Sequence, residues 1–134
     1  MIVSTRGRYA LRVLIDIAEH SHEERIPLKE VAERQEISQK YIEAIMTLLS
    51  KNGLVDAVHG KGGGYKLNRK PSEYKVADVL RLTEGTLAPV ACLEPDSQPC
   101  PKKENCRTLP MWTKLDELIE NYLESVTIED LMKK

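Results

Sequence analysis

The chain has three cysteines, and all of them fall in one short stretch, at Cys92, Cys100 and Cys106. Seven residues separate the first pair and five separate the second, in a segment rich in Pro, Asp, Asn and Lys. Thiolates can act as nucleophiles, form disulfides, or bind zinc and iron–sulfur clusters. Because the number of cysteines is odd, a simple disulfide pair does not account for all three.

Four thiol chemistries compete for this segment. A catalytic thiol needs a His or a cation nearby to lower its pKa; the three histidines are distant in sequence, whereas Lys102, Lys103 and Arg107 are close. A disulfide switch would use two of the three cysteines. Zinc knuckles usually pair cysteines two to four residues apart. An iron–sulfur cluster tolerates widely spaced thiolates on a loop and can take one non-cysteine ligand. Spacing alone leaves zinc and iron–sulfur open.

The length and composition set limits on the fold and the compartment. A chain of 134 residues can form one domain, or a small domain with an appendage. It has no apolar run long enough to span a bilayer, and its start, MIVSTRGRYAL, lacks the apolar region of a signal peptide. We therefore expect a cytoplasmic protein, in which clustered thiols indicate metal binding or redox chemistry.

The charge is distributed unevenly along the chain. The net charge is −1, but residues 1–70 hold twelve Lys and Arg against nine Asp and Glu, and residues 71–134 hold eight against twelve. A basic front and an acidic back are typical of a nucleic-acid-binding module joined to a second unit. We therefore predict a DNA-binding domain over 1–75 and a cysteine loop with a dimerisation helix over 76–134.

The first half has the element order of a winged helix-turn-helix. Residues 5–20 predict a helix with a buried face of Leu11, Leu14, Ile15 and Ala18, widened by Val13 and Ile17. A second helix starts near Pro27, and a break of three or four residues leads to a third helix over 39–52. A strand, a glycine-rich turn and a second strand follow. The predicted fold is mainly α, with a small β-hairpin and a long C-terminal helix.

Two features of this half could contact DNA. The third helix carries polar residues that can hydrogen-bond base edges, and Ser38 at its start can cap the helix or bind a phosphate. Alone, that face is also typical of an ordinary solvated helix. His59 and Lys61 lie at the glycine turn, where a basic tip can reach the minor groove or a phosphate. The glycines do not form a nucleotide-binding motif, because the last position of G-x-G-x-x-G from Gly60 is Tyr65.

The second half ends in a long helix with a regular apolar stripe. We predict this helix from about Leu109 to Ser125, after a short helix over 76–84 and before a last helix that Thr127 and Asp130 cap. The stripe steps by three and four residues and indicates a dimer seam, the alternative being packing within one subunit. Its members are Trp112, Leu115, Ile119, Tyr122 and Val126.

Several stretches resemble the Rrf-type winged-helix transcriptional regulators, which include IscR-, NsrR- and CymR-type proteins. They are STRGRYALR, IPLKEVAERQEIS, KYIEAIM, KNGLV, GGGYKL and TIEDL, together with the three cysteines before the long helix. The resemblance implies a regulator rather than an enzyme, and a homodimer on a palindromic operator. It implies a [2Fe-2S] or [4Fe-4S] cluster on Cys92, Cys100 and Cys106; the alternative is a CymR-type regulator controlled by a partner protein or by thiol oxidation. The resemblance places DNA-contacting residues at the start of the recognition helix and in the wing: Ser38, Gln39, Lys40, Tyr41, Glu43, His59 and Lys61. Arg6 and Thr47 complete the predicted DNA-contacting set.

The sequence departs from the family at the fourth cluster ligand. The iron–sulfur branch has a His three residues after the third cysteine, where this chain has Leu109, and some nitric-oxide sensors have an Asp near the chain start, where this chain has Arg8. Leucine has no lone pair to donate. The remaining candidates are a loop carboxylate (Glu94, Asp96 or Glu104), water, a small thiol, or a group from a second subunit such as Glu43 or His59.

Overall fold

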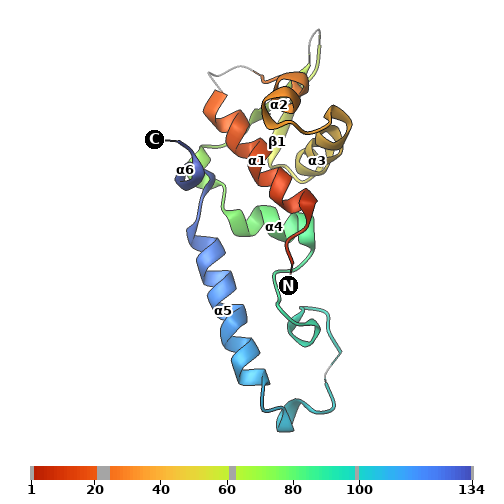
Figure 1. Ribbon diagram of the computed structural model, residues 1–134, viewed down its shortest axis with the longest axis vertical. Helices are drawn as coiled ribbons and strands as arrows, with labels where there is room; N and C mark the ends of the chain where they lie inside the picture. Colours follow the sequence, from red (N-terminus) through yellow and green to blue (C-terminus); the bar gives the residue numbers. More distant parts are fainter. Residues whose placement is uncertain (1, 21–24, 61–62, 99, 134) are drawn as a thin grey trace.

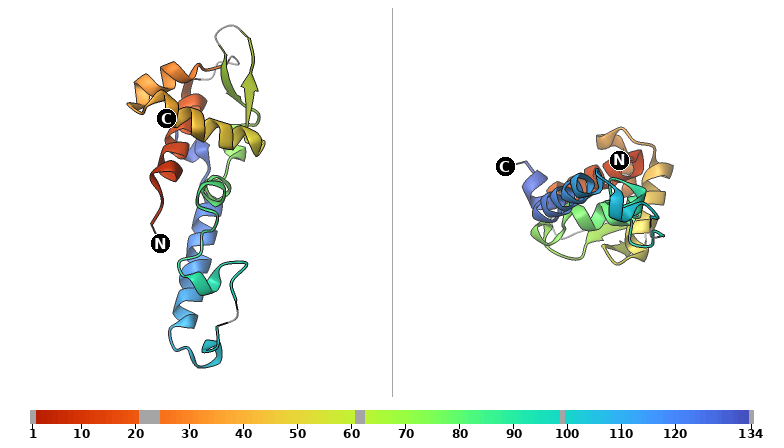
Figure 2. Two further views of the ribbon diagram at one scale, coloured as in Figure 1. Left: turned by 90° about the vertical axis from the view of Figure 1, so that its right-hand side faces the viewer. Right: turned by 90° about the horizontal axis from the view of Figure 1, so that it is seen from below.

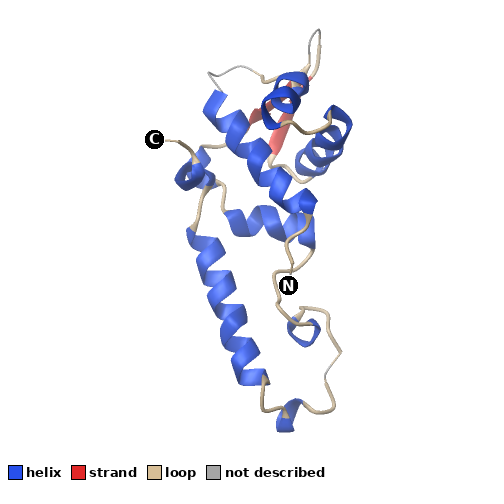
Figure 3. Cartoon of the chain, viewed as in Figure 1, coloured by secondary structure: helices blue, strands red, loops and turns tan. Residues whose placement is uncertain are grey.

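The computed structural model describes residues 2–20, 25–60, 63–98 and 100–133. Figure 3 shows a mainly helical chain with one small hairpin, which confirms the predicted fold class. The elements are α1 (Thr5–His20), α2 (Leu28–Gln35), α3 (Gln39–Lys51), β1 (Val55–Val58), β2 (Gly64–Leu67), η1 (Pro71–Glu73), α4 (Val76–Glu84), η2 (Ala91–Leu93), η3 (Lys103–Asn105), α5 (Leu109–Ser125) and α6 (Ile128–Leu131). None of the helices in these ranges is long and apolar enough to cross a membrane.

The molecule has a head and a stalk. In Figure 1, α1, α2, α3 and the hairpin form the head, α4 crosses beneath it, and α5 runs alongside the descending loop as the stalk. The side view in Figure 2 places the hairpin at one end of the long axis and the cysteine loop at the other. The chain then climbs back along α5, so that α6 lies against the head. The cysteines and the helix-turn-helix therefore lie far apart.

The head is held by an aliphatic core between α1 and α3. Its fully buried members recur at helical spacing on both helices, which buries one stripe of each. Burying side chains of this size stabilises the fold by about 1.5–3 kcal/mol each. The predicted face of α1 was partly wrong: Leu14, Val13 and Ile17 are fully buried as expected, but Leu11, Ile15 and Ala18 are half-buried. The completely buried residues on the two helices are Ala10, Val13, Leu14, Ile17, Ile42, Ile45, Met46 and Leu49.

A charged residue, Asp16, is buried beside this core. Its carboxylate accepts hydrogen bonds from Arg34 Nη2 at 2.6 Å and Arg34 Nε at 3.0 Å, and from Gln35 Nε2 at 2.9 Å. The bidentate geometry satisfies both oxygens, which a carboxylate with 1% exposure requires. Asp16 therefore fixes the angle between α1 and α2.

The turn and ends of the helix-turn-helix follow from local sequence. Glu36 adopts the left-handed conformation (φ 54°) after α2, and Ser38 Oγ caps α3 by accepting from Tyr41 N at 3.2 Å. At the other end of α3, Gly53 has φ 73° and Leu54 N donates to Leu49 O at 2.9 Å, which is a Schellman motif. The predicted break and both predicted ends of the third helix are thus confirmed.

The hairpin is anchored to the entrance of α2. β1 and β2 pair antiparallel, with Val55 opposite Leu67 and Val58 opposite Gly64. Ile26 adds a bridge to Tyr65, through backbone bonds of 2.9 and 3.2 Å. A Cβ on Gly64 would lie 2.7 Å from Ile26 O, and its φ is +143°, so only glycine permits this approach. Lys61, predicted at the tip, lies outside the described residues.

A second apolar cluster joins α4 to α5. Its buried residues are Val76, Ala77, Leu80 and Leu87, and Val3, Leu11, Ile119, Leu123 and Val126 pack against it. Arg81 reinforces this contact by donating to Glu120 and to Glu124, the latter at 2.6 Å. Ile119 and Val126, two members of the predicted dimer stripe, therefore face their own subunit.

The C-terminal helix returns to the first core. Thr127 and Asp130 form the predicted capping box of α6, each side chain accepting from the other's backbone N–H. This places Ile128, which is fully buried, among the core residues of α1 and α3. The end of the predicted second unit thus completes the core of the first.

Candidate functional site

The exposed side of α3 carries the polar residues that the sequence predicted. Gln39, Lys40, Glu43 and Thr47 are all exposed, and Ser38 stands at the N-terminus of the helix. The Thr47 hydroxyl donates to Glu43 O at 2.8 Å, within the helix itself. Gln39, Lys40 and Glu43 therefore present the side chains on this face that can hydrogen-bond to bases.

Tyr41, one of the predicted DNA-contacting residues, packs against α1. Its ring is 38% exposed and meets the edge of Tyr9 on α1 at 5.6 Å between centroids. Arg12 lies over the Tyr9 ring at 5.2 Å and donates to Gln35 O at 2.6 Å. This arrangement links α1 to both helices of the helix-turn-helix, and it leaves the exposed part of Tyr41 available to a ligand.

Two other predicted DNA residues lie elsewhere on the head. Arg6 donates from Nη2 to Thr83 O at 2.7 Å, near the C-terminal end of α4, so at least part of its guanidinium ties α1 to α4. His59 is exposed at the start of the hairpin turn. The structure therefore groups the α3 residues on one face, with His59 on the adjoining hairpin and Arg6 toward α4.

A hollow of about 270 Å³ lies between the two helix starts and the hairpin. Its lining residues are Pro27, Leu28, Lys29, Gln39, Gly63, Gly64 and Tyr65. The N-terminal ends of α2 and α3 both border it, and such ends favour anions. Lys29 was missed by the sequence analysis; a basic residue in the first turn of the second helix was the available signal.

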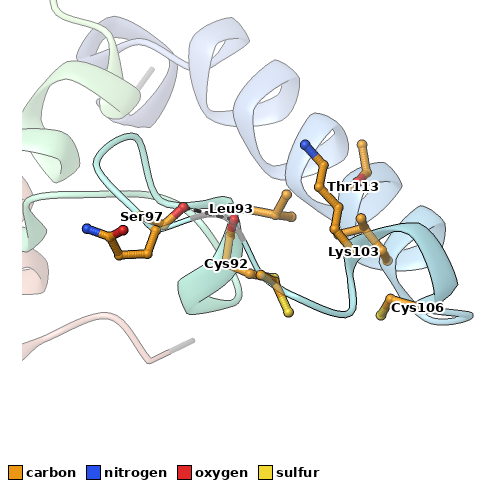
Figure 4. A pocket seen from close by; sticks show the side chains of 9 residues that line it. Cys92, Leu93, Ser97, Lys103, Cys106 and Thr113 are labelled. Atoms are coloured by element: carbon orange, nitrogen blue, oxygen red, sulfur yellow. Dashed lines mark hydrogen bonds between the residues drawn. The ribbon is translucent and has the colours of Figure 1, made fainter.

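The three cysteines line one pocket of about 400 Å³, shown in Figure 4. Its other lining residues are Leu93, Ser97, Gln98, Lys103, Leu109 and Thr113. The 3-10 turns η2 and η3 carry Cys92 and lead to Cys106, and the first turn of α5 supplies Leu109 and Thr113. The structure thus brings together thiols that the sequence separates by seven and five residues.

The thiols differ in their surroundings. Cys92 and Cys100 are exposed, whereas Cys106 is half-buried. The Cys106 sulfur lies 3.5 Å from the Thr108 hydroxyl, and this hydrogen bond, helped by the backbone N–H groups of Thr108 and Leu109, lowers the pKa of the Cys106 thiol. Ser97 Oγ donates to Cys92 O at 3.0 Å and steadies the turn that carries the first thiol.

The three thiols share a pocket but are not grouped around one point. In the part of the chain that the structure describes, no three His, Cys, Asp or Glu side chains lie close enough to hold one metal ion. Thiolates bind different irons of a cluster, so they need to share a pocket rather than converge on a point. Leu109, at the position of the family's histidine, does line this pocket. The loop carboxylates Glu94, Asp96 and Glu104 do not line it.

One face of α5 is apolar and exposed. Met111, Leu115, Leu118 and Tyr122 step by four, three and four residues and are 37–67% exposed. Leu115 and Tyr122 belong to the predicted stripe, Trp112 is half-buried, and Met111 and Leu118 were missed. The exposed heptad face therefore shares Leu115 and Tyr122 with the predicted stripe but has Met111 and Leu118 as its other members, because the other side of the helix covers α4.

Comparison with known proteins identifies relatives over nearly the whole chain. The sequence model of Rrf2, described as an iron-dependent transcriptional regulator, matches residues 3–134. The HTH-type transcriptional regulator IscR of Xenorhabdus nematophila is 37% identical over 133 residues, 99% of this chain and 80% of that protein.

Two solved structures share the fold. CymR, the global cysteine regulator of B. subtilis, superposes with a TM-score of 0.78 at 32% identity, covering 98% of this chain and 95% of that one. IscR of T. potens superposes with a TM-score of 0.74 at 35% identity, covering 98% of this chain and 85% of that one. These relatives are regulators and not enzymes, and the winged helix-turn-helix described above is the element that binds DNA. The chain therefore belongs to the Rrf2 family of DNA-binding transcriptional regulators.

Proposed function

We propose that this protein is a dimeric regulator whose affinity for a palindromic operator is controlled by an iron–sulfur cluster held by Cys92, Cys100 and Cys106. The observation that carries the proposal is their position on one pocket at the end of the stalk. When bound, the cluster supplies iron that oxygen, nitric oxide or iron shortage can alter.

The chain's own residues prepare the pocket for thiolate ligands. Because the pKa of the Cys106 thiol is lowered, a larger fraction of it is thiolate at neutral pH, and the thiolate is the form that binds metal. Leu93 and Leu109 contribute the apolar part of the pocket lining. Lys103 contributes the positive charge among the lining residues and offsets part of the negative charge of the thiolates.

A second copy of this chain is the proposed partner of the α5 face. Met111, Leu115, Leu118 and Tyr122 follow the heptad spacing of a helix pair, and burying such residues stabilises each interface. A palindromic operator requires two heads at a fixed separation, which a symmetric dimer provides. Because α5 also leads out of the cysteine loop, a change in that loop would reach the dimer seam directly.

The root of the cysteine loop is also tied to α1. Glu84, the last residue of α4, accepts from Ser4 N at 2.6 Å and from Ser4 Oγ at 2.7 Å. A Cβ on Gly7 would lie 2.7 Å from the same carboxylate, so the helix approaches closely. From there α1 leads to Tyr9, which contacts Tyr41 at the start of α3. These contacts support a route from the loop to the DNA-binding face.

On that face, we assign base contacts to Gln39, Lys40 and Glu43, and phosphate contacts to the helix start at Ser38 and to Lys29. Glutamine, lysine and glutamate can distinguish base edges in the major groove. Their exposure on one side of α3 supports this division. His59, at the start of the hairpin turn, and Lys61, which lies between the two strands in the sequence, are the proposed contacts to the flanking backbone or minor groove.

Purification without oxygen tests the cluster. The wild type should be brown and contain iron and acid-labile sulfide, and Cys92→Ala, Cys100→Ala and Cys106→Ala should each lose the visible absorbance and change operator affinity. Leu109→His should lengthen the lifetime of the cluster in air, because it restores a donor in the pocket wall. Stoichiometric zinc in anaerobically purified protein, or full absorbance in the cysteine variants, would remove the cluster from the proposal.

A second candidate is control of operator binding by a partner protein or by thiol oxidation, without a cluster. The structural similarity to CymR and the lowered pKa of the Cys106 thiol both favour this candidate. This candidate predicts colourless protein under the same anaerobic conditions. It also predicts that peroxide changes the operator affinity of iron-free protein and that Cys106→Ala abolishes this response, whereas the cluster proposal predicts no such dependence in iron-free protein.

A further inference from the structure

A group of hydrogen bonds joins the exit of the hairpin to the exit of α3. Two carbonyl groups, those of Gly53 and Leu54, lie where the chain leaves α3 and enters β1. Gly53 O accepts from Asn68 Nδ2 and from Arg69 Nη2, both at 2.8 Å. Leu54 O accepts from the Tyr74 hydroxyl at 2.6 Å. The segment that follows β2 therefore holds the segment that precedes β1.

Tyr74 is the buried member of this group. It is 2% exposed, and its hydroxyl accepts from Asn68 N at 3.2 Å while it donates to Leu54 O. A buried phenol needs such partners, because removing its hydroxyl from water is otherwise costly. Burial raises the pKa of Tyr74, so the hydroxyl keeps the proton that it donates. The guanidinium carbon of Arg69 lies 5.0 Å from the centre of the ring.

The backbone at Tyr74 is attached to the C-terminal part of the chain. Tyr74 O accepts from Ile128 N at 3.0 Å. The next residue, Lys75, pairs with Thr127 in an antiparallel bridge at the junction of α5 and α6. Tyr74 thus contacts the end of α3, the exit of the hairpin and the end of the stalk, and it is fixed in place from both sides.

The direction of the hairpin depends on how its ends are held. A two-stranded hairpin is only marginally stable alone, and in Figure 2 this one projects from the head beside α3. His59 follows β1 directly and lies about 13 Å from the base of the hairpin, since each of the four residues of β1 adds about 3.3 Å. A small rotation at the base therefore moves His59 relative to α3.

We propose that Tyr74 is a positioning residue for operator binding, whose hydroxyl fixes the direction of the hairpin relative to α3. The hairpin then contacts the DNA that flanks the base pairs read by α3. This inference rests on the proposed roles of α3 and His59. Because Tyr74 is buried, it acts on DNA only through the two backbone groups that its hydroxyl binds, Leu54 O and Asn68 N.

Two lengths of one duplex test the proposal. A duplex that the wild type selects from a random pool is prepared at full length and with its flanking base pairs removed from both ends. Fluorescence anisotropy gives the affinity of the full chain for each, and the ratio of the two affinities measures the contribution of the flanks. We expect Tyr74→Phe to lower this ratio about fivefold, the effect of one lost hydrogen bond.

Two further variants separate positioning from general stability. Asn68→Ala removes a bond to Gly53 O from an exposed residue, and it should lower the ratio in the same direction. Ile17→Val loosens the core of the head without touching these bonds, and it should leave the ratio at the wild-type value. An unchanged ratio in Tyr74→Phe, or an equal fall in Ile17→Val, would overturn the proposal. Should Tyr74→Phe fail to fold, the ratio in Asn68→Ala decides in the same way.

His59→Ala distinguishes this inference from the function on which it rests. If the hairpin contacts the flanks, His59→Ala should also lower the ratio. A wild-type affinity that does not depend on the flanks would overturn the proposed hairpin contacts and this inference together. A ratio that falls in His59→Ala but not in Tyr74→Phe would overturn this inference alone.

Discussion

The head and the cysteine loop of this protein differ in how tightly their residues are packed. In the head, core residues of α1 and α3 have no exposed surface, and its buried carboxylate is fully hydrogen-bonded. In the loop over 85–108, Leu87 is the one residue classed as buried among those that the structure describes, and the regular structure is two 3-10 turns. A packed core has one arrangement, whereas an exposed loop with few apolar contacts changes conformation at little cost.

This contrast suits a regulator. The element that reads DNA must keep its geometry, and in the proposed function the cysteine loop must change when it senses a signal. The two are joined at the C-terminal end of α4, through Ser4–Glu84 at the root of the loop and through Arg81 at the contact with α5. Substitutions in one region at a time test whether the head and the loop contribute as differently to stability and binding as their packing indicates.

The largest expected effect is on the stability of the head. Asp16→Ala removes the acceptor of hydrogen bonds from Arg34 and Gln35, and we expect the free energy of unfolding to fall by about 2 kcal/mol. Asp96→Ala, an exposed carboxylate of the loop, should change it by less than about 0.5 kcal/mol. Urea unfolding followed by circular dichroism measures both. Similar losses in the two variants would contradict the contrast between the regions.

The second effect is on assembly. Leu115→Glu with Leu118→Glu should give a monomer whose operator affinity is lower by about a hundredfold, because two linked heads bind far more tightly than one. Lys114→Glu makes the same change in net charge on the exposed surface of α5 and serves as the control. Sedimentation and operator titration measure the result. A double variant that remains dimeric would assign the seam to another surface.

The third effect concerns the joint between the regions. Glu84→Gln should weaken the hydrogen bonds from Ser4 and destabilise the protein by about 1 kcal/mol at neutral pH. Burial opposes ionisation of Glu84, but the Ser4 bonds outweigh it and lower its pKa. The carboxylate thus stabilises the fold above its unfolded pKa, and this contribution is lost as the pH falls through the lowered folded pKa.

The pH dependence distinguishes this joint from simple packing. In the wild type, stability measured by urea unfolding should decline as the solution becomes acidic enough to protonate Glu84. In Glu84→Gln this part of the decline should be missing. If the two proteins lose stability in parallel over the acidic range, the charge of Glu84 does not matter to the joint.

The smallest effect is on DNA binding without sequence preference. Lys29→Ala should weaken binding to every duplex a few-fold and reduce the slope of log affinity against log salt by about one, because it removes one phosphate contact. Lys51, exposed at the far end of α3, gives the matched variant Lys51→Ala, which should leave the slope unchanged. Fluorescence anisotropy at several salt concentrations measures both slopes.

Much of the fold could be predicted because its signals are local. The bounds of α4 and α5 match the sequence-based expectation, and the capping box at Thr127 and the glycine end of α3 are both present. Caps, turns and helical periodicity depend on residues within one or two turns of each other. The order of these elements then determined the winged helix-turn-helix and the position of the cysteine loop.

The candidate site was only partly predictable. The exposed face of α3 and the shared pocket of the three cysteines agree with the sequence-based reading. Lys29 was missed, Arg6 binds Thr83 O, and the exposed stripe of α5 includes Met111 and Leu118 in place of Ile119 and Val126. A helix with apolar residues on two sides does not reveal which side another helix will cover.

By itself, the sequence determined the helices, their ends, the turn of the helix-turn-helix and the number of thiol donors, because each depends on neighbouring residues. The tertiary structure decided that Asp16 is buried, that Ile128 completes the head, that Glu84 binds Ser4, and which side of α5 remains free. The Ser4–Glu84 bonds join residues 80 positions apart, and Ile128 near the C-terminus packs in one core with α1. Contacts of that kind follow from how the helices pack against each other, which no local pattern specifies.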